Sequence, residues 1–95
     1  MDFEWNDAKR EANLAKHGID FMDAVAIWQE SIIDPADTRV VAGEERRVAL
    51  GMIGKDELII AVIYTWRGKA RRLISARRGR RHERAHYQDR FGRGQ

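Results

Sequence analysis

Cysteine is absent from this 95-residue sequence, and proline occurs only once. Without cysteine the chain has no disulfide framework and no thiolate metal site. The longest apolar run, Leu58 to Tyr64, has the length of a strand and is too short to cross a membrane. The first residues are mixed and acidic, unlike a secretory signal peptide, so we expect a cytoplasmic protein.

The residues that are present describe one small folded unit. Hydrophobic residues make up 43% of the chain, and three of them are tryptophan. This content is typical of a packed globule and not of a disordered basic tail. Neither an internal repeat nor a linker is visible, so we expect a single domain over residues 1–95.

Charge is divided unevenly along the chain. Residues 67–95 contain ten arginines and one lysine against two acidic residues, whereas residues 1–66 contain seven basic and thirteen acidic residues. A basic segment on an acidic body is typical of a surface that binds a polyanion. Arginine dominates the segment, and its planar guanidinium can bind phosphate through two parallel hydrogen bonds. RNA is the leading candidate ligand, and an acidic partner protein is the alternative.

Capping residues and hydrophobic periodicity predict two helices near the N-terminus. Asn6 is suited to cap a helix that runs to about Lys16 and ends at Gly18. Asp20 starts a second helix, in which apolar residues recur at helical spacing. The members of this apolar stripe are Phe21, Ala24, Val25 and Trp28.

The rest of the chain predicts strands and one more helix. The expected strands span residues 31–33, 46–53, 58–66 and 70–77. A polar loop is expected after Pro35, and a helix is expected from Gly79 to about Phe91. Both sides of the 70–77 strand are partly apolar, so alternation does not decide which side faces the core. The order favours an α+β fold with two N-terminal helices, a three- to four-stranded antiparallel meander and a basic C-terminal helix.

One motif suggests zinc. The segment from His82 to His86 reads H-E-R-A-H and matches the H-E-x-x-H pattern on an expected helix. A catalytic zinc needs a third protein ligand, and the nine residues after His86 contain no His or Glu. The surrounding arginines also oppose the binding of a divalent cation. We therefore predict no metal site and no cofactor.

The arginines around the strand-to-helix junction form the second candidate site. Arg77 and Arg78 lie where the strand gives way to the helix, and such a junction can aim several guanidinium groups into one cleft. The whole cluster comprises Arg71, Arg72, Arg77, Arg78, Arg80, Arg81 and Arg84. A solvated surface, or a surface that docks an acidic protein, is the alternative interpretation.

Two further side chains are candidates for proton transfer. His17 belongs to the residue type that changes charge near neutral pH, although a His at a helix end also complements the helix dipole. Tyr87 follows Glu83 and Arg84 on the same helical face. It can stack on a base or donate a proton, and it can equally pack the helix against the sheet.

Several short motifs also occur together in a familiar order. They are Phe3-Glu4-Trp5, Ala12-Asn13, Lys16-His17-Gly18-Ile19 with Phe21, Gly43-Glu44-Glu45-Arg46, Ile74-Ser75-Ala76-Arg77-Arg78, and Glu83-Arg84 with Tyr87. Together they resemble the BrnT family of bacterial type II toxins. The resemblance implies a RelE-like fold and a ribonuclease that arrests growth. It also implies a BrnA-like antitoxin with a ribbon-helix-helix domain, so that DNA is contacted only through the complex.

The resemblance further implies metal-independent attack of a ribose 2′-OH on the adjacent phosphate. We assign Arg77 and Arg78 to the scissile phosphate, and Glu83, Tyr87 and His17 to the proton transfers. The other expected RNA-binding residues are Arg67, Arg71, Arg72, Arg80, Arg81, Arg84 and Lys16. The alternative function is a non-catalytic module that binds RNA or docks the antitoxin.

Overall fold

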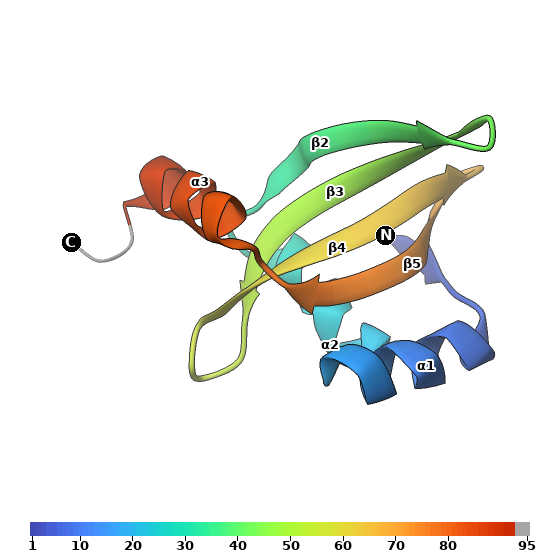
Figure 1. Ribbon diagram of the computed structural model, residues 1–95, viewed down its shortest axis with the longest axis horizontal. Coiled ribbons are helices and arrows are strands. Elements are labelled where there is room, and N and C mark those ends of the chain that lie inside the picture. The colour runs from blue at the N-terminus through green and yellow to red at the C-terminus, as the bar shows by residue number, and fades with distance from the viewer. Residues whose placement is uncertain (93–95) are drawn as a thin grey trace.

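The computed structural model describes residues 1–92, so the last three residues of the predicted domain lie outside the described part (Figure 1). Within residues 1–92, nine elements follow one another. They are β1 (Asp2–Glu4), α1 (Asp7–His17), α2 (Phe21–Ala24), the 3-10 helix η1 (Val25–Gln29), β2 (Ile33–Val41), β3 (Glu44–Ile53), β4 (Leu58–Arg67), β5 (Ala70–Arg78) and α3 (Arg81–Phe91). No helix within residues 1–92 is both long and apolar enough to cross a membrane.

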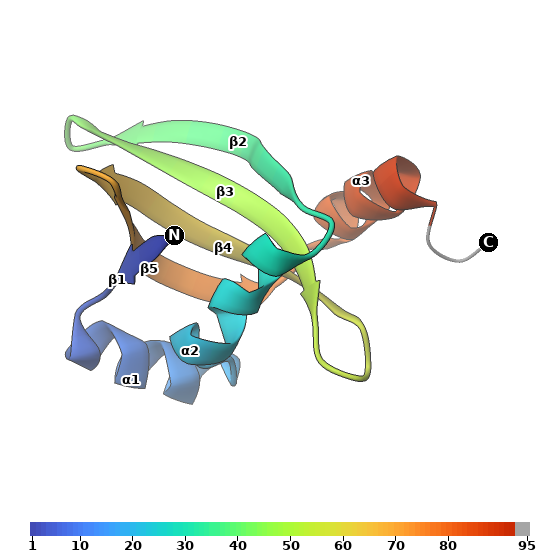
Figure 2. The same ribbon diagram turned by 180° about the vertical axis from the view of Figure 1, so that it is seen from behind.

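The strands form one five-stranded sheet in the order β1-β5-β4-β3-β2. Strands β2 to β5 are antiparallel, as predicted, whereas β1 pairs in parallel with the start of β5 (Figure 2). The α+β class is confirmed, but the sheet is mixed and has one strand more than the predicted RelE-like meander. The three residues of β1 are too few to show a periodic pattern.

Strand β2 occupies much of the segment that we predicted to be a polar loop. Its pairing with β3 begins at Ile33, is interrupted by an irregularity, and resumes at Asp37. Pro35 lies in this interruption and on the outermost strand, where a proline removes no needed ladder hydrogen bond. The loop prediction was therefore wrong, because the proline marks an irregular edge strand and not a break in the strand.

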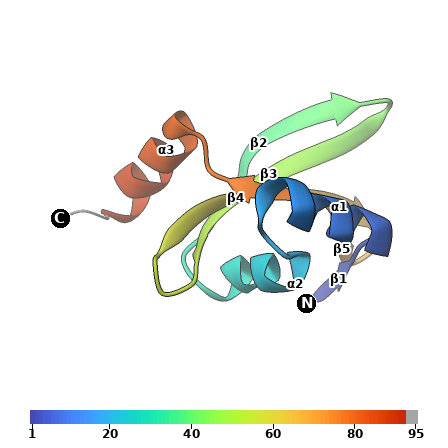
Figure 3. The same ribbon diagram turned by 60° about the horizontal axis from the view of Figure 1, so that its bottom comes forward.

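The two predicted N-terminal helices pack on one face of the sheet (Figure 3). Asn6 caps α1 by accepting a hydrogen bond from the Lys9 N–H at 3.2 Å, and Gly18 ends the helix with a left-handed φ of 71°. Helix α2 is shorter than predicted and continues as η1. Phe21 and Ala24 are fully buried against the sheet. We call this side of the sheet the covered face and the opposite side the open face.

A bulge in β5 decides which of its side chains lie on each face. Ser75 pairs with Ile63 and Leu73 pairs with Tyr64, so Ile74 is an extra residue between two paired neighbours. The bulge shifts the alternation by one residue, and Leu73 and Ala76 both become buried on the covered face. Arg77 then lies on the open face.

At the outer edge of β5, a side chain of α1 forms hydrogen bonds with backbone groups that no strand within residues 1–92 pairs. The Asn13 amide donates a hydrogen bond to the Ala76 carbonyl at 2.8 Å, and its oxygen accepts one from the Ala76 N–H at 3.1 Å. This buried amide takes the place of a neighbouring strand. It fixes the last part of β5, from which the chain enters α3.

Helix α3 packs at one end of the open face. Its Tyr87 is buried in a second apolar cluster that lies between the sheet and the helix. The other buried members of this cluster are Ile33, Val48, Leu50, Ile59 and Ala61. The rest of the open face is not covered by a helix of the described residues (Figures 1 and 3).

Candidate functional site

A groove of about 460 Å³ lies on the open face, between the sheet and the start of α3. Its walls come from two separate parts of the sequence, the β2–β3 hairpin and the β5–α3 segment, with one residue from β4. The charged and titratable lining residues are Asp37, Arg39, Arg46, Arg77, Arg80, His82, Glu83 and His86. Four arginines against two carboxylates make the groove cationic, which suits a phosphate-bearing ligand.

The junction between β5 and α3 is held close to β4 by Gly79. The Gly79 N–H donates to the Ile59 carbonyl at 2.9 Å, and a Cβ on Gly79 would lie 3.2 Å from that same oxygen. Glycine therefore allows the chain to turn here at close range. Arg84 stabilises the turn by donating to the Gly79 carbonyl at 2.6 Å.

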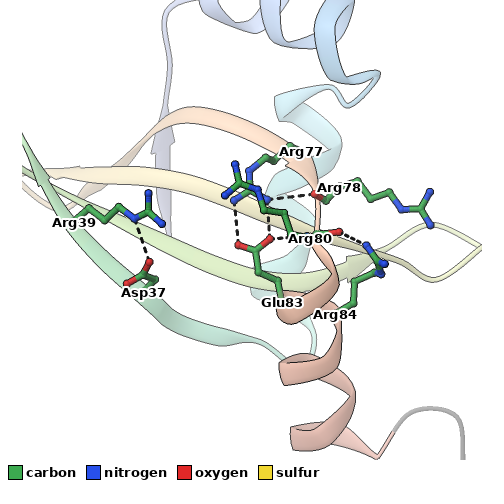
Figure 4. A network of polar contacts seen from close by, with 8 residues as sticks. Asp37, Arg39, Arg77, Arg78, Arg80, Glu83 and Arg84 are labelled. Atoms are coloured by element: carbon green, nitrogen blue, oxygen red, sulfur yellow. Dashed lines mark hydrogen bonds and ion pairs between the residues drawn. The ribbon is translucent and has the colours of Figure 1, made fainter.

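An ion pair between Arg77 and Glu83 joins the end of β5 to the first turn of α3 (Figure 4). Two nitrogens of Arg77 donate to the two Glu83 oxygens at 2.7 and 3.1 Å. Glu83 also accepts the Arg80 backbone N–H at 2.7 Å, which caps the helix. Burial alone raises the pKa of Glu83, but these hydrogen bonds outweigh it and hold the pKa below its ordinary value. Glu83 is therefore a fixed carboxylate that orients Arg77.

The other groove arginines are less restrained. Arg39 contacts Asp37 at 3.3 Å, and the Arg39 side chain is 68% exposed. Arg46 contacts Glu44 at 3.4 Å and lies opposite Arg39 in the β2–β3 register. Arg80 is exposed at the rim. These guanidinium groups can reorient toward a ligand in the groove.

Sequence reasoning missed the contribution of β2 and β3 to this site. Asp37, Arg39 and Arg46 belong to the part of the chain whose overall charge is acidic. A usable signal was present, because Asp37, Arg39 and Val41 alternate toward one face once β2 is recognised as a strand. The loop prediction after Pro35 concealed that alternation.

The two histidines of the H-E-x-x-H motif also line the groove. His82 and His86 are exposed and lie one helical turn apart on α3. The carboxylate between them points to Arg77 and not to a shared cation site. Within residues 1–92, no group of three or more His, Asp or Glu side chains is arranged to hold a metal ion.

Several residues predicted for catalysis lie elsewhere. The Tyr87 hydroxyl donates to the Ser31 carbonyl at 2.9 Å and borders a separate hollow near the β3–β4 turn. Arg78 is exposed but does not line the groove, and its side chain points away from the Glu83 cluster (Figure 4). His17 lies in the last turn of α1 on the covered face. Of the predicted catalytic set, the groove brings together Arg77 and Glu83.

The predicted RNA-binding arginines are distributed over the molecule. Arg67 and Arg72 do not line the groove; Arg67 contacts Glu44 at 3.7 Å, and Arg72 contacts Glu4 at 2.7 Å. Arg81 is exposed at the start of α3, and Lys16 is exposed on α1. The residues of the predicted cluster therefore do not form one surface.

Arg71 is enclosed on the covered face. Its guanidinium carbon lies 4.3 Å from the ring centre of Trp66, 5.0 Å from that of Trp28 and 5.4 Å from that of Tyr64. It also pairs with Asp34 at 3.4 Å, and the two side chains are only 15% and 11% exposed. This arginine is a structural element and does not reach the groove.

Comparison with known proteins identifies the family. A search of the curated proteins finds no match. A family model described as the ribonuclease toxin BrnT of a type II toxin–antitoxin system matches residues 5–83. This match spans most of the chain and includes the β5–α3 junction down to Glu83. The chain therefore belongs to the BrnT family of ribonuclease toxins of type II toxin–antitoxin systems.

Proposed function

We propose that this toxin cleaves RNA in the groove of the open face, without a metal ion. A ribose 2′-OH attacks the adjacent phosphorus and forms the 2′-O–P bond, while the bond from phosphorus to the 5′-oxygen breaks. The products are a 2′,3′-cyclic phosphate and a free 5′-OH. The observation that supports this proposal most strongly is the convergence of four arginines on one open groove at the β5–α3 junction.

Arg77 is the arginine best fixed to stabilise the reacting phosphate. Three of its five N–H donors are engaged, two by Glu83 and one by the Arg78 carbonyl. The remaining donors are held in a fixed direction, and a preorganised donor stabilises developing negative charge without reorganisation. Arg80, Arg39 and Arg46 are the cations that hold the flanking phosphates, and Arg78 is an RNA contact outside the groove.

The same surface provides a way to silence the toxin. Membership of a type II family implies an antitoxin partner and an RNA substrate. We take the partner to be a BrnA-like protein with a ribbon-helix-helix domain, whose acidic residues occupy the cationic groove. DNA is then contacted through this partner, and the toxin acts in the cytoplasm, where its RNA substrate is found.

The test is incubation of labelled RNA with the purified toxin in EDTA, beside Arg80→Gln. Arg80 lines the groove, and its exposed side chain can be replaced with little effect on folding. We expect the variant to cleave limiting RNA about 10-fold more slowly, because it loses one charge-assisted contact to a flanking phosphate, worth about 1.5 kcal/mol. Arg90→Gln is the matched control, since Arg90 is exposed on the same helix and does not line the groove.

The product ends and the control decide the outcome. Cleavage in EDTA with 2′,3′-cyclic phosphate ends, slowed by Arg80→Gln and not by Arg90→Gln, is the expected result. Intact RNA that is still bound with a steep salt dependence would instead indicate a non-catalytic RNA-binding module. RNA that is neither cleaved nor bound at low salt would indicate a surface that serves only the antitoxin.

A further inference from the structure

The reaction needs two proton transfers that the arginines of the groove cannot supply. Attack requires a base for the 2′-OH proton, and departure of the 5′-oxygen requires an acid. Guanidinium groups stay protonated at all ordinary pH values. Glu83 is buried, paired with Arg77 and hydrogen bonded to the Arg80 N–H, with a pKa below its ordinary value. It is therefore a poor base and cannot serve as an acid at neutral pH.

The other candidates predicted from sequence are directed away from the groove. The Tyr87 hydroxyl donates to the Ser31 carbonyl, in a different hollow. His17 lies on α1, on the covered side of the sheet. Asp37 is the one remaining carboxylate of the lining, and it contacts Arg39.

Two histidines, His82 and His86, line the groove, and histidine is the residue type that most often acts as a general acid or base. They are four residues apart on α3, so they project from the same side of the helix. His82 is in the first turn, next to Glu83 and within two residues of Arg80. Both imidazoles are exposed and line the same groove as the four arginines.

We propose that His82 and His86 are the general base and general acid of this toxin. One imidazole, in its neutral form, removes the 2′-OH proton as the oxygen attacks phosphorus. The other, in its protonated form, gives a proton to the 5′-oxygen as the bond from phosphorus to that oxygen breaks. The proposal rests on the proposed ribonuclease function. It gives the two histidines of the H-E-x-x-H motif a role that needs no zinc. One of them, His86, lies after the last residue that the family model matches.

The arrangement predicts a bell-shaped dependence of the cleavage rate on pH. The reaction requires one neutral and one protonated imidazole, so the rate falls when both are protonated and when both are neutral. The charged groups that line the groove around the pair are Asp37 and Arg39 on β2, Arg46 on β3, Arg77 on β5, and Arg80 and Glu83 at the start of α3. The arginines do not change charge over the pH range in which imidazoles titrate, so the two limbs report the histidines.

The test compares His82→Gln and His86→Gln with the parent over a range of pH. We expect each variant to cleave RNA about 10²- to 10⁴-fold more slowly, which is the usual contribution of general acid–base catalysis. Each variant should also lose one limb of the pH profile. Binding of an RNA with 2′-O-methyl groups, which cannot be cleaved, should stay within a few-fold of the parent. Gln88→Ala, on the exposed part of the same helix, is the control for changes to α3.

Each outcome separates this inference from the proposed function. A parent that cleaves RNA, together with His variants that cleave at the parental rate and keep both limbs, would overturn the inference and leave the function standing. Weaker binding with an unchanged pH profile would make the histidines RNA contacts and would also overturn it. A parent that leaves RNA intact at every pH would overturn both proposals.

Discussion

On the covered face of the sheet, Arg71 lies among three aromatic rings and pairs with Asp34, and both of these charged side chains are nearly buried. On the open face, Arg39 and Arg46 have only loose carboxylate contacts, and Arg80 is exposed beside the groove. The same residue type therefore packs the core on one side and presents charge on the other. Composition alone cannot separate these two uses of arginine, whereas burial and pairing do.

The two faces also differ in how much added volume they accept. Gly51 faces Ile27 on the covered face, and a Cβ on Gly51 would lie 2.4 Å from the Ile27 Cβ. We expect Gly51→Ala to lower the free energy of unfolding by about 3 kcal/mol, because overpacking of a tight core has effects of this size. Val48→Ile adds one methyl group beside the groove and should change the free energy of unfolding by less than about 1 kcal/mol. Urea denaturation measures both values, and equal effects would remove the contrast.

The contribution of the open face to RNA binding is tested by removing the two arginines that strands β2 and β3 contribute to the groove. We expect the double variant Arg39→Gln with Arg46→Gln to bind 2′-O-methyl RNA about 100-fold more weakly. The slope of log K against the logarithm of the salt concentration should also become less steep, by about 0.7 for each phosphate that is no longer neutralised. Lys9→Gln with Lys55→Gln removes the same charge from exposed positions outside the groove. Binding assays at several salt concentrations should leave this control near the parent. Equal losses in both pairs would mean that only net charge matters.

The structural use of arginine is tested at Arg71. We expect Arg71→Leu to lower the free energy of unfolding by about 2 kcal/mol, since breaking a buried ion pair is strongly destabilising. The loss is smaller than for an isolated pair, because Asp34 still accepts hydrogen bonds from Trp28 and Tyr64. The folded variant should bind RNA as the parent does. A tenfold weaker affinity for RNA with unchanged stability would instead mean that Arg71 contacts RNA, as the sequence suggested.

The smallest effect concerns an ion pair at the edge of the covered face. The Arg10 side chain and the Met22 N–H hydrogen bond to Asp20 and lower the pKa of its carboxyl to about 2, from an ordinary value of 3.8. A lowered pKa stabilises the folded state above pH 3.8, and this stabilisation is lost as the pH falls through about 2. Asp20→Asn keeps the helix cap but removes the charge. Its stability should fall below that of the parent at pH 7 and converge with it near pH 2 in denaturation curves.

The ends of α1 and the position of α3 were predictable because their signals are local, whereas the early end of α2 at Ala24 was not predicted. Asn6 and Gly18 mark the ends of α1 in the sequence, and both act there in the structure. The run from Gly79 to Phe91 likewise predicted α3. Capping and left-handed turns depend on a few neighbouring residues, so one sequence is enough to show them.

The site was only partly predictable because its other walls depend on pairing between distant strands. Arg77 and Arg80 were expected from the basic run, and both line the groove. Arg39 and Arg46 join them only because β2 continues past Pro35 and pairs with β3. The bulge at Ile74 sets the face on which Arg77 lies, and nothing local marks it.

The central claim is that RNA contacts the open face and not the covered one. Backbone amide NMR shifts of the toxin, measured while a short 2′-O-methyl RNA is added, test this claim directly. We predict that the shifts concentrate at Arg39, Arg46, the Arg77–Arg80 junction and the first turn of α3, while α1 and α2 stay unchanged. Shifts centred on α1 and α2, with none around the groove, would contradict the account.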